Sequence, residues 1–264
     1  MEMKLIVQLA RISALMMLAL YNLNACAESD ATTSIAVGLD SNSGQYGTAN
    51  VTRIVTIPVI GKYETDSWSF KLTVPYIRIT TFGGVLPGMG ASSKKVAISN
   101  RASTQSGPGD VVAATTYFAI YGTDSTPGLD ITGKVKLPTA SKTAGLGTGE
   151  TDYFLQLDGY QKFNQLTVYG SVGRKFLGSS DDIPLHDVNY GSIGASYQFS
   201  EKISAGLNLD AAQASSAAGS NQLELTVSVV RKLEKGRKVQ GYLLKGLADG
   251  SPDTGIGVLL TFVF

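Results

Sequence analysis

The sequence predicts an all-β fold: a transmembrane antiparallel up-and-down β-barrel of about twelve strands that follows an N-terminal signal peptide. Three features of the chain lead to this prediction. They are an apolar strand that ends at Phe264, an alternation of short and long connections, and a secretory leader. In a soluble sandwich, nothing requires short connections to follow the even-numbered strands and long ones the odd-numbered strands.

The C-terminal strand keeps one apolar face to its last residue. Ile256, Val258, Leu260, Phe262 and Phe264 share this face. An uncovered apolar strand invites edge pairing in a soluble protein, whereas a strand that closes a barrel in lipid has no free edge. A terminal Phe is also typical of bacterial outer-membrane barrels. We therefore expect the barrel-assembly machinery to engage this strand.

The N-terminus has the pattern of a secretory signal. Positive charge at Lys4 and Arg11 precedes an apolar stretch, and an A-x-A cleavage site follows at residues 25–27. We expect a signal peptide over residues 1–27 and an outer-membrane barrel over residues 28–264.

An alternative is open at the cleavage site, because residues 23–26 resemble a lipobox in which Cys26 would be lipidated. Cys26 is the only cysteine, which excludes intramolecular disulfides and cysteine metal clusters. The remaining chain has no unbroken apolar run of the roughly 18 residues that a membrane helix needs. Lys and Arg, 22 in number, nearly balance 21 Asp and Glu, so nucleic acid is not an expected partner.

Alternating, aromatic and β-branched segments predict the strands in order. They lie at residues 34–40, 52–63, 68–79, 111–121, 129–138, 152–160, 166–176, 190–199, 203–211, 223–231, 239–247 and 255–264. The even-numbered strands are followed by short connections at 64–67, 122–128, 161–165, 200–202 and 232–238. The odd-numbered strands are followed by longer, Gly/Ser/Asp-rich ones at 41–51, 80–110, 139–151, 177–189, 212–222 and 248–254. Periplasmic turns and longer extracellular loops alternate in this way.

Within most strands, apolar and polar side chains alternate with period two. Charged side chains at mid-strand are costly on a lipid face and ordinary on a wet lumen face. The inward-facing polar side chains are therefore candidates for lining a solute path: Lys71, Asp130, Lys134, Lys136, Asp158, Asn208, Asp210, Glu224 and Lys245. Because both signs occur, a strongly anion- or cation-selective pore is not indicated. The same charges would also fit a plugged lumen in which neighbouring strands neutralise each other.

The third and eleventh strands break the pattern, and residues 242–245 of the eleventh can be assigned to either face. Arg78 shares its face with Val74 and Tyr76, so either a bulge restores the phase or Arg78 lies above the bilayer. Pro58 and Pro75 sit at mid-strand, where each removes a ladder donor, and the sequence offers no reason for either.

Several ordered fragments resemble one outer-membrane family. They are Leu-Thr-Val-Pro-Tyr at 72–76, Ser-Gly-Pro-Gly-Asp-Val at 106–111, Lys-Val-Lys-Leu-Pro-Thr at 134–139, Leu-Gly-Thr-Gly at 146–149 before Asp152, and Lys-Gly-Leu-Ala-Asp-Gly-Ser-Pro-Asp at 245–253. Together they resemble the family labelled "MetA-pathway of phenol degradation". The resemblance implies an outer-membrane barrel and the passage of aromatic or hydrophobic compounds. It transfers no site residues.

No catalytic, cofactor or metal site is expected. His186 is the only histidine, and it falls in an acidic loop where a solvated side chain is the simpler interpretation. The glycines at 145–149 lack the Lys-Ser/Thr and the helix of a phosphate loop. The longest connection, over residues 83–109, is expected to fold inward or to cover the mouth of the barrel.

The sequence thus predicts an outer-membrane channel or transporter for small organic solutes, hydrophobic or aromatic ones among them, with lipid around it. Twelve strands lie between filled eight-stranded barrels and open sixteen-stranded porins. Three alternatives are open: a non-conducting structural or adhesive barrel, a barrel-embedded hydrolase, and a lipoprotein sandwich.

Overall fold

The computed structural model describes residues 31–264, apart from 84, 87–89 and 92–101. The predicted signal peptide and Cys26 lie outside these residues. The strands are β1 (Thr32–Gly44), β2 (Thr52–Glu64), β3 (Trp68–Thr81), β4 (Val85–Leu86), β5 (Gly90–Ala91), β6 (Ser103–Pro108), β7 (Val111–Ile120), β8 (Gly128–Leu137), β9 (Asp152–Phe163), β10 (Leu166–Phe176), β11 (Val188–Ser200), β12 (Ile203–Ala212), β13 (Gln222–Lys232), β14 (Arg237–Gly246) and β15 (Thr254–Val263). In this part of the chain, no helix has the length and apolarity needed to cross a membrane.

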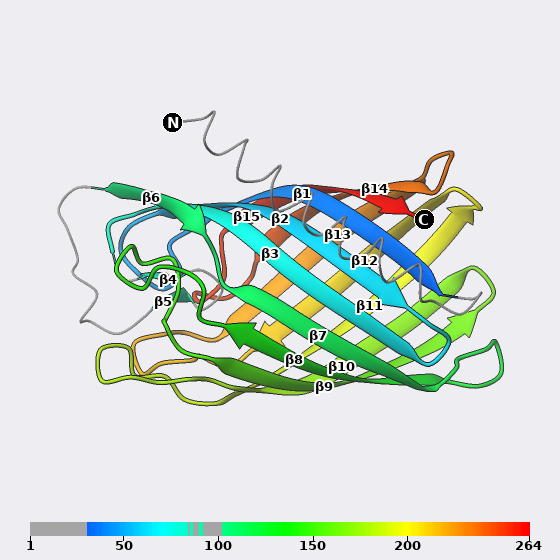
Figure 1. Cartoon of the computed structure of the whole chain (residues 1–264), viewed down its shortest axis with the longest axis horizontal. Helices are drawn as coiled ribbons and strands as arrows, with labels where there is room; N and C mark the ends of the chain where they lie inside the picture. The colour runs from blue at the N-terminus through cyan, green and yellow to red at the C-terminus, as the bar shows by residue number, and fades with distance from the viewer. Residues whose placement is uncertain (1–30, 84, 87–89, 92–101) are drawn as a thin grey trace.

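Twelve of the described strands close into one antiparallel barrel (Figure 1). The order is β1, β2, β3 and then β7 to β15, with β15 returning to β1. The β1–β15 seam is paired from Ser34 with Val263 to Ser43 with Thr254, so the first and last strands close the barrel along their length. The predicted fold class is confirmed.

Short and long connections lie at opposite ends of this barrel. The short turns gather at the end that also holds the C-terminus, and the long loops lie with β4 and β5 at the other end (Figure 1). The β9–β10 turn needs only two residues, and Asn164 adopts a φ of 55° there. Asn tolerates this left-handed conformation well, which suits a tight hairpin.

One predicted loop contains part of the wall. Residues 80–110 were expected to form a single connection, but β6 pairs with β3 from Tyr76–Pro108 to Thr81–Ser103. β7 pairs with the other half of β3. The two strands are separated at Gly109, whose backbone N–H donates to Pro75 O at 2.8 Å. The wall is therefore extended toward the loop end beside β3.

The two mid-strand prolines lie opposite each other, since Pro58 of β2 pairs with Pro75 of β3. Pro75 stands where β3 changes partner from β7 to β6, so its missing N–H falls at an existing interruption of the ladder. Pro58 faces Gly38 of β1, where a Cβ would lie 3.2 Å from Pro58 Cγ. One glycine and two prolines, Gly38, Pro58 and Pro75, thus lie next to one another on three neighbouring strands.

Arg78 is placed on the outer face near the loop end of β3. The β2–β3 register runs without a break from Arg53–Thr80 to Glu64–Ser69, so no bulge shifts its phase. Of the two alternatives for Arg78, the structure favours a position at the loop end over a bulge.

Apolar side chains cover the outer face of the strands. Ile193, Leu243 and Ile256 are each about 60% exposed on this face, and Val258 of β15 and the C-terminal Phe264 are also exposed. Trp68 and Tyr117 lie near the short-turn end with ring centroids 4.8 Å apart. Such a surface is typical of a barrel whose outer side contacts lipid.

Candidate functional site in the barrel lumen

Every candidate polar residue except Lys245 lies on the inner face of the wall. Lys71, Lys134, Lys136, Asp158, Asn208, Asp210 and Glu224 line internal cavities, and Asp130 pairs with Asp158 on the same face. Lys245 is a correction. It is exposed and pairs with Leu225 on the outer face, because the register places Leu244 and Thr226 inside.

The sequence prediction missed several inner residues. Lys62 and Lys175 line cavities, and Asp152 is 1% exposed at the start of β9. The period-two alternation alone would have assigned both lysines to the inner face, because each precedes an aromatic residue of the outer face, Tyr63 or Phe176. Asp152 gave no such signal, since it stands at a strand end.

The lumen contains adjoining cavities. A polar cavity of about 600 Å³ lies between β8 and β13 and includes Lys134, Lys175, Asp210 and Glu224. A cavity of about 460 Å³ toward the long loops shares Glu224 with it and is lined largely by apolar groups. A cavity of about 240 Å³ toward the short turns shares Lys134. The inner space therefore changes from apolar at the loop end to polar at the centre.

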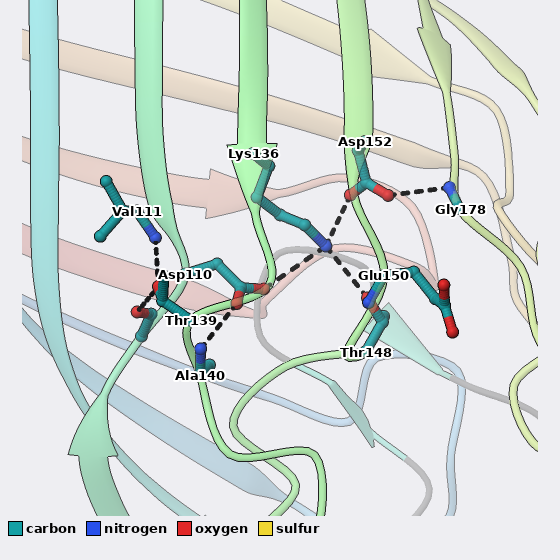
Figure 2. A network of polar contacts seen from close by, with 10 residues as sticks. Asp110, Val111, Lys136, Thr139, Ala140, Thr148, Glu150, Asp152 and Gly178 are labelled. Carbon is teal, nitrogen blue, oxygen red and sulfur yellow. Dashed lines mark hydrogen bonds and ion pairs between the residues drawn. The ribbon is translucent and has the colours of Figure 1, made fainter.

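A buried ion-pair network joins the wall to the loop after β8 (Figure 2). Lys136 Nζ lies 2.7 Å from Asp152 Oδ2 and 3.4 Å from Asp110 Oδ2. The same ammonium donates to Thr148 Oγ1 at 3.1 Å. Gly178 N–H donates to the other Asp152 oxygen at 2.9 Å. These groups, called the Lys136 network below, satisfy a charge that would be costly if it were buried alone.

The start of the same loop is hydrogen-bonded to residues 109–111, where β6 has ended and β7 begins (Figure 2). Ala140 N–H donates to Asp110 Oδ1 at 2.9 Å, and Thr139 Oγ1 donates to Gly109 O at 3.0 Å. Val111 N–H in turn donates to Thr139 Oγ1 at 2.9 Å. Residues 138–151 are thus fixed to the wall at both ends.

Apolar side chains of the loops fill the mouth at this end. Leu146, 3% exposed, packs with inner-face residues and with residues of other loops. This mouth cluster consists of Tyr46, Ile54, Ile77, Ile79, Val85, Ala140 and Leu146. Burial, together with the charges of Glu224 and Asp253, raises the pKa of the Tyr46 hydroxyl.

The long connection after β3 contributes to the mouth as well. Val85 belongs to the mouth cluster, and Leu86 packs with Ile183 and Leu185 of the β10–β11 loop. For these residues, the expectation that the segment folds inward agrees with the structure. The sequence prediction did not foresee that the β8–β9 and β10–β11 loops would do the same.

Inner-face tyrosines lie against glycines of the neighbouring strands. A Cβ at Gly194 would lie 2.5 Å from the Tyr169 ring, and one at Gly257 would meet the Tyr242 ring. Gly173 and Tyr190 form a similar pair. Because glycine has no side chain, each ring can lie close to the wall, which leaves more of the lumen free.

His186 lies exposed in the β10–β11 loop, as the sequence prediction placed it. Its backbone N–H donates to Ser215 O, while Ser179 Oγ accepts from Leu185 N–H. Within the part of the chain that the structure describes, no group of three or more His, Cys, Asp or Glu residues is arranged to hold a metal ion.

The chain resembles known outer-membrane channels in structure. No protein-family model and no curated protein sequence matches it. An outer membrane channel from Pseudomonas putida is similar with a TM-score of 0.69 at 14% identity, over 90% of this chain and 97% of that one. The KdgM porin is similar with a TM-score of 0.53 at 12% identity, over 88% and 99% of the two chains. At such identities the likeness establishes the fold, which is that of an outer-membrane β-barrel.

Proposed function

We propose that this chain is an outer-membrane channel through which small organic solutes pass by diffusion, hydrophobic and aromatic ones among them. The observation that carries the proposal is the lumen. A closed twelve-strand barrel encloses adjoining cavities, and charged side chains of both signs face into them. Inner charges that serve only to neutralise each other would be paired, whereas Lys71, Lys134 and Lys175 form no ion pair among the described residues.

The cavities support an organic solute with both apolar and polar parts. The cavity beside the mouth cluster offers Ile54, Ile77 and Leu244, and the central cavity offers Lys134, Asp210 and hydroxyl groups. An aromatic compound with a polar substituent can contact both environments in turn. The resemblance to the "MetA-pathway of phenol degradation" family supports the same class of solute.

The packed mouth supports a channel that opens. The mouth cluster and the Lys136 network hold residues 138–151 across the loop end of the lumen. Movement of a loop of this kind is a common means of gating. We infer that solute entry requires displacement of this loop.

The same packing favours a second candidate, a non-conducting structural or adhesive barrel that acts through its loops. The two functions differ in permeability. Purified protein in liposomes is tested for swelling with a panel of aromatic and sugar solutes, and in planar bilayers for conductance. The proposal requires solute-dependent swelling above that of protein-free liposomes. No swelling and no conductance would leave the non-conducting barrel.

A further inference from the structure

Four lysines of the inner face lie in one row across the wall. Strand register pairs Lys62 with Lys71, Lys71 with Ala114, Ala114 with Lys134, Lys134 with Phe154, and Phe154 with Lys175. This basic row therefore crosses six neighbouring strands from β2 to β10. Lys62 is near the short-turn end of β2, and Lys175 is near the loop end of β10.

A second row, displaced from the basic row by four residues toward the short-turn end of β8, is acidic. Asp130 pairs with Asp158, Asp158 with Ser171, Ser171 with Ser192, Ser192 with Asp210, and Asp210 with Glu224. This acidic row runs from the short-turn end of β8 to the loop end of β13. Its Asp and Glu residues are separated only by serines.

Both rows run across the strands, and because the strands of a barrel are tilted, the rows wind around the lumen from one end toward the other. Residues of a strand rise by about 3.4 Å each, so the backbones of Lys134 and Asp130 on β8 are separated by about 14 Å along the wall. The head groups of Lys134 and Asp158 lie closer, because the single side-chain amide of Gln156 bridges them. Among the ion pairs of the described residues, none joins a lysine of the basic row to a carboxylate of the acidic row. The two rows therefore present opposite charges to whatever lies between them.

Gln156 shows what chemistry fits between the rows. Its carbonyl Oε1 accepts from Lys134 Nζ at 2.9 Å, and its amide Nε2 donates to Asp158 Oδ1. The Tyr190 hydroxyl donates to the same Oε1 at 2.8 Å. An acceptor is thus required on the lysine side and a donor on the aspartate side. Asn208 Oδ1, in the same cavity, is buried without a hydrogen-bond partner.

The geometry points to zwitterionic organic solutes, with aromatic amino acids as the simplest case, as the class that this lumen prefers. A carboxylate would contact the basic row, an ammonium the acidic row, and an aromatic ring the faces of Tyr169 and Tyr190. A solute with one charge gains from one row and is repelled by the other. A zwitterion is attracted by both rows over β8, β9 and β10, where the two rows run side by side. This inference rests on the proposed channel function and makes its solute class specific.

The test compares four aromatic solutes in liposome swelling with the protein purified from outer membranes. They are phenylalanine, N-acetylphenylalanine as an anion, trimethylphenethylammonium as a cation, and phenyl glucoside as a neutral solute. We expect phenylalanine to enter about fivefold faster than each of the other three, relative to protein-free liposomes. Equal entry of all four would overturn the inference and keep the channel. Entry of none would overturn the channel itself.

Variants locate the preference. Lys134→Gln is expected to remove the advantage of phenylalanine over the cation, and Asp158→Asn its advantage over the anion. Lys245→Gln is the matched control, because this lysine lies on the outer face of the barrel. Heat-modifiable gel mobility verifies folding, and Lys175→Gln and Asp210→Asn repeat the test in the same rows if either first variant fails to fold. An unchanged preference in folded variants of both rows would overturn the inference.

Discussion

Lys136 of β8 and Asp152 of β9 form a buried ion pair with a separation of 2.7 Å at the loop end of the lumen. They pair across neighbouring strands, and the intervening chain is the loop that carries Leu146 into the mouth. This charge pair therefore holds the loop in place together with the packing of Leu146.

The Lys136→Met variant is expected to release the loop. Asp152 would then be buried without its ammonium partner, which costs about 3–5 kcal/mol in comparable buried pairs. We expect higher conductance in planar bilayers and a lower free energy of unfolding. Lys142→Met is the control, because its contact with Asp182 is exposed and 3.5 Å long. Equal conductance in the two variants would show that the pair does not hold the mouth closed.

The Leu146→Ser variant tests the mouth cluster. Loss of this buried side chain is expected to cost about 2–4 kcal/mol of local packing. Residues 138–151 should then be cleaved faster by protease added to the loop side of proteoliposomes. Leu247→Ser, at an exposed loop position, should leave the cleavage rate unchanged. Slow cleavage in both variants would contradict the packing role of Leu146.

The Gly257→Val variant tests the close packing of Tyr242 on the wall. A Cβ at this position would meet the ring, so the side chain must turn into the lumen. We expect lower conductance, with an overpacking cost of about 1–3 kcal/mol. Gly241→Val is a suitable control, since nothing lies within 4 Å of its Cβ position. A conductance equal to that of the control would mean that the ring does not border the solute path.

The Phe264→Ala variant tests the role proposed for the C-terminal residue. Phe264 is 68% exposed, so its removal should change the stability of the folded barrel by less than about 1 kcal/mol. The amount of barrel assembled in the outer membrane of cells should nevertheless fall. Phe199→Ala, at a residue 66% exposed near the short turns, should assemble normally. Equal assembly of both variants would argue against recognition of Phe264 by the barrel-assembly machinery.

The fold could be predicted because its signals are local. The period-two alternation of apolar and polar residues assigns most strands and their faces. The alternation of short and long connections shows how successive strands are joined into hairpins. β6 was missed because Ser103–Pro108 is rich in polar and turn-forming residues and pairs only on one side, with β3. Lys245 was misplaced because both Leu243 and Leu244 are apolar, so its face depended on a register that only pairing with β13 determines.

The site was less predictable, since it depends on contacts between distant segments. Each lysine of the basic row could be assigned to the inner face from its own strand. Their arrangement in one row depends on the register of six strands, which no local pattern encodes. The Lys136 network likewise joins Asp110 and Thr148, residues that the sequence placed only in loops.

If lipid contacts the apolar face of the barrel and water its inner face, labels on adjacent residues of one strand should differ in the reagents that reach them. Ile193 and Ser192 are adjacent in β11 and point to opposite faces. In a Cys26→Ser background, each is replaced by Cys, labelled with a nitroxide and measured in lipid vesicles against oxygen and a water-soluble nickel complex. We expect oxygen to relax the label at 193 and nickel the label at 192. Access of nickel to both positions, with no preference for oxygen at 193, would contradict this expectation.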